Sequence, residues 1–77
     1  MNDTFKIIAD LIEDIADIPN DEIRENSLVI DDLNLSSIEI MTIIAELERQ
    51  FSIKISEKEL LSIRSIKDLL TVIEKEK

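Results

Sequence analysis

Residues 32–51 read DLNLSSIEIMTIIAELERQF, and this stretch decides the fold that the sequence predicts. Its apolar residues recur at spacings of three and four, which predicts an amphipathic helix with one face against a core. The helix is therefore expected to be the central element of the chain. Its apolar face consists of Ile40, Met41, Ile43, Ile44, Leu47 and Phe51.

Two adjacent serines at the start of this helix have different expected roles. Ser36 and Glu39 have the spacing of a capping box, in which each side chain accepts a hydrogen bond from the other residue's backbone N–H. Ser37 then takes the first helical position with no capping role. Its hydroxyl is expected near solvent at the positive end of the helix dipole, a favourable place for a phosphate. An ordinary exposed serine also fits this pattern, because serines are common at helix starts.

The chain before this stretch predicts one helix and a long loop. Apolar spacing predicts a helix over residues 5–16, and Asp3 or Thr4 is its expected cap. Pro19 ends it, and the loop over residues 20–35 is long enough to need anchoring in the core. The helix should turn Phe5, Ile8, Ile12 and Ile15 inward, and the loop should have a helical turn at residues 21–24 and apolar anchors at Ile23, Leu28, Val29, Ile30 and Leu33.

The chain after the central helix predicts two more helices. Ser56 and Glu59 form a second capping box, which starts a short helix that ends near Leu61. Ser65 and Asp68 start the last helix in the same way. The predicted fold class is therefore all-α: a small four-helix bundle of three main helices and one short helix, with a long first loop.

Size and composition limit the chemistry of the chain. Its 77 residues suit one small domain, residues 1–77, and the lack of glycine favours helices over hairpins. Without histidine or cysteine, the sequence has no thiol nucleophile, few options for a metal site and no histidine to activate a serine. No metal site is expected, and a small hydrolase is a remote hypothesis.

The net charge of −9 points to basic protein surfaces as partners. The same charge disfavours nucleic acid and anionic membranes, whose phosphates would be repelled. Solubility alone is an alternative reason for this charge. No stretch has the length of a membrane span and no signal peptide is recognised, so a monomer in the cytoplasm is expected.

The whole chain resembles the acyl carrier protein family. Residues 32–38, DLNLSSI, are similar to the Asp-Leu-Gly-x-Asp-Ser-Leu run of that family, and residues 47–51 are similar to the end of the helix that follows it. The later elements also follow the family's order. The resemblance places Ser37 at the serine that holds 4'-phosphopantetheine, and it implies a carrier that is not itself an enzyme.

The resemblance also implies the partners of such a carrier. A phosphopantetheinyl transferase, with coenzyme A and Mg²⁺, would attach the arm to Ser37. Acyl-loading and acyl-processing enzymes with basic docking surfaces would then act on acyl thioesters, in fatty acid, polyketide or related biosynthesis. The expected docking set is Ile38, Glu39, Met41, Glu46 and Glu48. A solvated face is the alternative for Glu46 and Glu48, and a core filler or a groove edge is the alternative for Met41.

The sequence departs from the family pattern just before the serine. Ser36 replaces an Asp that helps to bind metal during modification, and Asp31 or Asp32 is the candidate substitute. Asn34 replaces the usual Gly but can also adopt a positive φ. Two alternatives therefore stay open: an unmodified protein-interaction module with the carrier fold, and an aminoacyl or peptidyl carrier of a specialised pathway.

Overall fold

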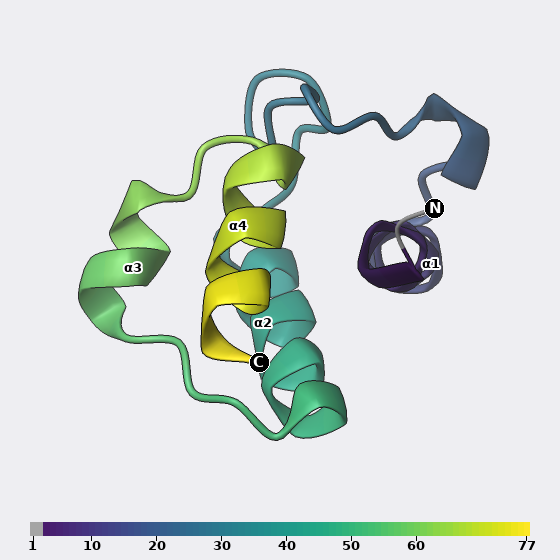
Figure 1. Cartoon of the computed structure of the whole chain (residues 1–77). Helices are drawn as coiled ribbons and strands as arrows, with labels where there is room; N and C mark the ends of the chain where they lie inside the picture. The colour runs from purple at the N-terminus through teal and green to yellow at the C-terminus, as the bar shows by residue number, and fades with distance from the viewer. Residues whose placement is uncertain (1–2) are drawn as a thin grey trace.

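The structure is a computed structural model that describes residues 3–77, and Figure 1 shows their arrangement. Within these residues it has four α-helices, one short 3₁₀ helix and no named strand. The predicted all-α fold of three main helices and one short helix is therefore confirmed. The elements are α1 (Asp3–Ala16), η1 (Asn20–Glu22), α2 (Ser37–Phe51), α3 (Glu57–Ser62) and α4 (Ile66–Glu76).

The core lies where the apolar faces of α1, α2 and α4 meet. Ile8 and Ile12 of α1, Leu47 of α2, and Ile66 and Ile73 of α4 are almost completely shielded from solvent. Each such side chain stabilises the fold by roughly 1.5–3 kcal/mol relative to leaving it exposed. The helical spacing in the sequence predicted this core correctly. Four side chains of the predicted apolar faces are only partly buried and pack against its edge: Phe5, Ile15, Ile40 and Phe51. Met41, also predicted on the apolar face of α2, is 53% exposed.

The first helix begins earlier than predicted. Asp3 and Thr4 lie inside α1, so neither is the residue that flanks and caps it. Thr4 is buried, and the Nζ atom of Lys77 donates a hydrogen bond to its hydroxyl over 3.2 Å. This contact joins the last residue of the chain to the first helix, and it compensates the burial of a polar side chain.

The long first loop is anchored by some of the predicted residues and not by others. Ile23, Val29 and Leu33 are buried, whereas Leu28 is 37% exposed and Ile30 is 62% exposed. The prediction was wrong for Leu28 and Ile30 because neighbouring residues point to opposite sides where Leu28 pairs with Ser65 in an antiparallel bridge. The helical turn is η1, which begins one residue before the predicted turn.

Backbone hydrogen bonds join this loop to the start of α4. The backbone N–H of Val29 donates to the carbonyl of Arg64 over 2.9 Å, and the N–H of Ile66 donates to the carbonyl of Ser27 over 3.0 Å. Ser65 and Asp68 form the predicted capping box at the same point. The loop and the last helix therefore hold each other in place, which explains how a long loop without regular structure stays ordered.

We expect acid to weaken the start of α4 through Asp68. Its carboxylate accepts hydrogen bonds from the backbone N–H groups of Arg64 and Ser65, and these bonds hold the pKa of Asp68 below its ordinary value of 3.8. A carboxyl with a lowered folded-state pKa stabilises the fold above its ordinary pKa, and this contribution is lost as the pH falls through the folded-state value.

Urea unfolding at a series of pH values between neutral and about pH 2 measures this contribution. Asp68→Asn should lower the free energy of unfolding at neutral pH and flatten its decline in acid. If Asp68→Asn declines in acid as steeply as the wild type, the hydrogen bonds of Asp68 are not the cause.

Candidate functional site

A reciprocal pair of hydrogen bonds forms the start of α2. The Ser36 hydroxyl accepts from the backbone N–H of Glu39 over 3.1 Å, and the Glu39 carboxylate accepts from the backbone N–H of Ser36 over 2.8 Å. This is the capping box that the sequence predicts. Both side chains are therefore occupied in fixing where α2 begins.

Ser37 is the first residue of α2, and its side chain is exposed. Within residues 3–77 its hydroxyl has no hydrogen-bond partner, in contrast to the hydroxyl of Ser36. It lies at the positively polarised end of a 15-residue helix, where backbone N–H groups lack partners within the helix. The two adjacent serines thus differ as predicted: one is structural, and the other is available for chemistry.

The chain reaches this position through a left-handed turn. Asn34 has a φ of 54°, a conformation that Asn adopts at lower cost than most residues other than Gly. The buried side chain of Leu35 follows and anchors the approach to α2. Asn34, which stands where the resemblance places a Gly, therefore adopts the positive φ that was expected to be open to it.

The two candidate substitutes for a carboxylate beside Ser37 differ in their contacts. Asp32 accepts a hydrogen bond from the backbone N–H of Leu28 over 2.8 Å and so holds the first loop together. Asp31 is exposed and has no hydrogen-bond partner among the described residues. Across residues 3–77, no group of three or more acidic side chains is arranged to hold a metal ion.

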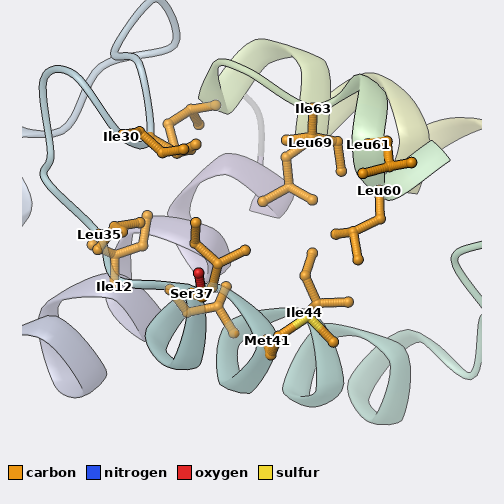
Figure 2. A pocket seen from close by; sticks show the side chains of 14 residues that line it. Ile12, Ile30, Leu35, Ser37, Met41, Ile44, Leu60, Leu61, Ile63 and Leu69 are labelled. Carbon is orange, nitrogen blue, oxygen red and sulfur yellow. The ribbon is translucent and has the colours of Figure 1, made fainter. Parts of the chain in front are cut away.

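An apolar cavity of about 270 Å³ opens beside Ser37. Its walls come from α2, α3 and the first loop, with contributions from α1 and α4 (Figure 2). Among residues 3–77, Ser37 is the only polar residue of its lining. In Figure 2, Leu60, Leu61 and Ile63 lie across the cavity from Ser37, Met41 and Ile44. The Ser37 hydroxyl therefore lies at the edge of a space suited to an aliphatic group.

The rim of this cavity was not predicted from the sequence. Leu61 is 78% exposed and lines the cavity together with Ile30, whose exposure contradicted the predicted core. Exposed aliphatic side chains are informative when they gather around a hollow. The signal in the sequence was Leu61, an aliphatic residue in a helix too short to bury many side chains. That signal alone does not reveal a cavity.

The predicted apolar docking residues share the outer surface of α2. Ile38 is 79% exposed, and Met41 lies one turn further along the same side. With Ser37, Thr42 and Ala45 they line a shallow depression. Met41 also lines the larger cavity, so the predicted groove edge and the predicted exposed face are both present at this residue.

The three predicted docking acids have partners within the chain. Glu39 belongs to the capping box, and Glu46 accepts two-point hydrogen bonds from Arg49. One carboxylate oxygen of Glu48 accepts from the backbone N–H of Ile55 over 2.8 Å. These contacts leave their negative charge in place but give each side chain an internal role. Their part in docking stays a prediction.

Most acidic side chains lie in the first half of the chain. Residues 10–39 contain ten acidic residues and a single basic one, Arg24. The acids of this segment thus surround Ser37 in sequence, while α2 itself contributes few free charges. Among the helices described between residues 3 and 77, none has both the length and the apolar character needed to cross a membrane.

Comparison with known proteins identifies similar chains. The family described as "Phosphopantetheine attachment site" matches residues 6–73. The chain is 31% identical over 75 residues to the acyl carrier protein of Helicobacter hepaticus. This match covers 97% of this chain and 99% of that protein. It is 34% identical over 73 residues to the acyl carrier protein of Chlamydia felis, covering 95% of this chain and 90% of that protein.

A longer relative also matches. The chain is 31% identical over 68 residues to the meromycolate extension acyl carrier protein of Mycobacterium leprae. This match covers 88% of this chain and 59% of that protein. Each of the three matches covers most of this chain, including both serines at the start of α2.

We expect the two serines to contribute differently to stability. Ser36→Ala removes the cap of α2 and should lower the free energy of unfolding by about 1 kcal/mol. Ser37→Ala removes a hydroxyl without a partner and should change it by less than about 0.5 kcal/mol. Urea unfolding of both variants measures the difference, and equal losses would show that Ser37 has a structural role.

Proposed function

The chain belongs to the acyl carrier protein family, and we propose that Ser37 carries its phosphopantetheine arm. Members of this family are carriers that do not catalyse reactions, so the chain is not an enzyme. Its cofactor is 4'-phosphopantetheine, which comes from coenzyme A. The observation that supports Ser37 is its exposed hydroxyl without a partner at the start of α2.

The surroundings of Ser37 fit the arm. The positive end of the α2 dipole favours a phosphate by about 0.3–1 kcal/mol at an exposed helix terminus. During modification the Ser37 hydroxyl loses its proton, and its oxygen bonds to the inner phosphorus of coenzyme A while the adenosine bisphosphate portion leaves. When bound, the arm supplies a thiol on which acyl groups are held as thioesters.

We propose that the cargo is an aliphatic acyl group, as in fatty acid or related biosynthesis. The support is the apolar cavity next to Ser37, whose lining residues other than Ser37 have no polar side-chain group. An aminoacyl or peptidyl cargo would place polar groups against this lining without hydrogen-bond partners, at a cost of roughly 1–3 kcal/mol for each buried group. Polyketide intermediates with few polar groups remain compatible with the cavity.

A carrier of this kind is served by separate enzymes. They include a phosphopantetheinyl transferase and acyl-loading and acyl-processing enzymes, for which we propose basic docking surfaces. The proposed contact surface combines exposed Ile38 and Met41 with the flanking charge of Glu39, Glu46 and Glu48. We further propose that residues 1–77 act as one carrier domain, monomeric and cytoplasmic.

The unmodified interaction module is the second candidate function. Its support is the position before Ser37, where Ser36 supplies a hydroxyl that is already occupied by the N–H of Glu39. Asp32, one of the two possible substitutes, is engaged with the loop. A transferase that takes a metal ligand from this position would therefore find no carboxylate at residue 36.

Modification of the purified, unmodified protein decides between the two functions. Incubation with coenzyme A, Mg²⁺ and a broad-specificity transferase should add the mass of one phosphopantetheine group, as measured by intact mass spectrometry. Ser37→Ala should abolish the gain, and Ser36→Ala should retain it. No gain, even with the transferase of the source organism, would favour the interaction module. Loss of labelling in Ser36→Ala alone would move the attachment point to Ser36.

A carboxylate at residue 36 should speed modification. Ser36→Asp keeps a good cap, because Asp is as favourable as Ser at this position. It also places a metal-binding group beside Ser37, so the labelling rate should rise. We expect a rise of roughly tenfold, because loss of a group that supports a metal site lowers activity or metal affinity by about 10-fold to 100-fold. Ser36→Asn is the matched control, since it caps the helix without a charge. Equal labelling rates for Asp and Asn would contradict this explanation.

A further inference from the structure

The α3 helix is one wall of the apolar cavity. Leu60 and Leu61 of α3 and Ile63 just after it face the α2 side of the cavity (Figure 2). In Figure 1, α3 stands apart from α1 on the opposite side of α2 and α4. The position of α3 relative to α2 therefore sets the width of the cavity.

The α3 helix has only six residues, which is too short for a helix to be stable by itself. Its one ion pair to another helix joins Glu59 to Lys75 over 3.6 Å, among the described residues. The Lys75 side chain of this pair is 71% exposed, and an ion pair that is open to solvent holds a helix weakly. Leu60 and Ile63 also pack against the core, and the chain segments at the two ends of α3 add to what fixes its position.

The C-terminal end of α3 is attached to the first loop through the backbone. The carbonyl of Arg64 accepts the hydrogen bond from the N–H of Val29, and the N–H of Arg64 donates to the carboxylate of Asp68 over 3.0 Å. This end is thus joined to the same contacts that start α4. It cannot move without disturbing them.

Ile53 and Ile55, which precede α3, pack at the core, and hydrogen bonds join both residues to Glu48 of α2. The backbone carbonyl of Glu48 accepts from the N–H of Ile53 over 3.1 Å, and its carboxylate accepts from the N–H of Ile55 over 2.8 Å. Ile55 is buried, and the next residue, Ser56, is the cap of α3. The Ser56–Glu59 capping box sets the first residue of α3, and the reach of the Glu48 side chain helps to set where in space that residue lies.

We propose that Glu48 is a positioning residue, whose carboxylate helps to set the width of the acyl cavity by holding the start of α3 in place. This inference rests on the proposed function only for the identity of the cargo. It assigns Glu48 a role inside the protein, whereas a docking role would depend on its negative charge toward a partner. The two roles make different demands on the side chain.

Two conservative variants separate reach from charge. Glu48→Gln keeps the length of the side chain and an oxygen acceptor but removes the charge. Glu48→Asp keeps the charge but is shorter by one methylene group and cannot reach the N–H of Ile55 in the same backbone geometry. Glu13→Gln is the matched control, because it removes one exposed charge from a residue of α1 that does not line the cavity.

The probe is octanol, a straight-chain alcohol that needs no arm on Ser37. Its binding to unmodified protein is followed by NMR through the methyl shifts of Leu60 and Ile63, together with hydrogen exchange at the amide of Ile55. Glu48→Asp should speed exchange at Ile55 and raise the octanol Kd, each by about tenfold. Glu48→Gln and Glu13→Gln should stay within about twofold of the wild type.

The opposite pattern would overturn the inference. A loss of octanol binding in Glu48→Gln with retention in Glu48→Asp would show that the charge matters and the reach does not. Unchanged binding in both, or no octanol binding by the wild type, would also overturn it. Labelling of the same proteins with coenzyme A tests the proposed function separately, because octanol binding does not require modification of Ser37.

Discussion

The structure depends on the reciprocal hydrogen bonds between Ser36 and Glu39. These bonds fix the residue at which α2 begins, and they occupy the hydroxyl of the first serine. The second serine is then held at the positive end of the helix with its hydroxyl available. If Ser37 were the cap instead, its hydroxyl would be occupied and Ser36 would lie outside the helix. The chemistry of the site thus follows from a local rule of helix capping.

The cavity beside Ser37 shows a second constraint, which concerns stability. A chain of this size buries a limited core, and an unfilled apolar space forgoes packing that would stabilise it. The fold tolerates the space because its remaining contacts hold the walls: the bridge between Leu28 and Ser65, and the carboxylate of Glu48 against Ile55. Under the proposed function, this unfilled space is the site where the aliphatic cargo would bind.

The sequence predicted the features that depend on nearby residues. The three capping boxes, the helical faces and the distinction between Ser36 and Ser37 all follow from spacings of three or four residues. Features that join distant segments were missed. Ile30 appeared suited to the core but lines a cavity rim, and the internal role of Glu48 depends on where Ile55 lies in space. The contact between Thr4 and Lys77 was missed for the same reason, because it joins the two ends of the chain.

We propose that helix capping leaves Ser37 as the tether for the arm. The most direct measurement is tandem mass mapping of the protein purified from its own cells, which locates any attached group to one residue of the peptide that contains both serines. The account predicts phosphopantetheine on Ser37 and an unmodified Ser36. A bare Ser37 in every molecule, or the arm on Ser36, would contradict it.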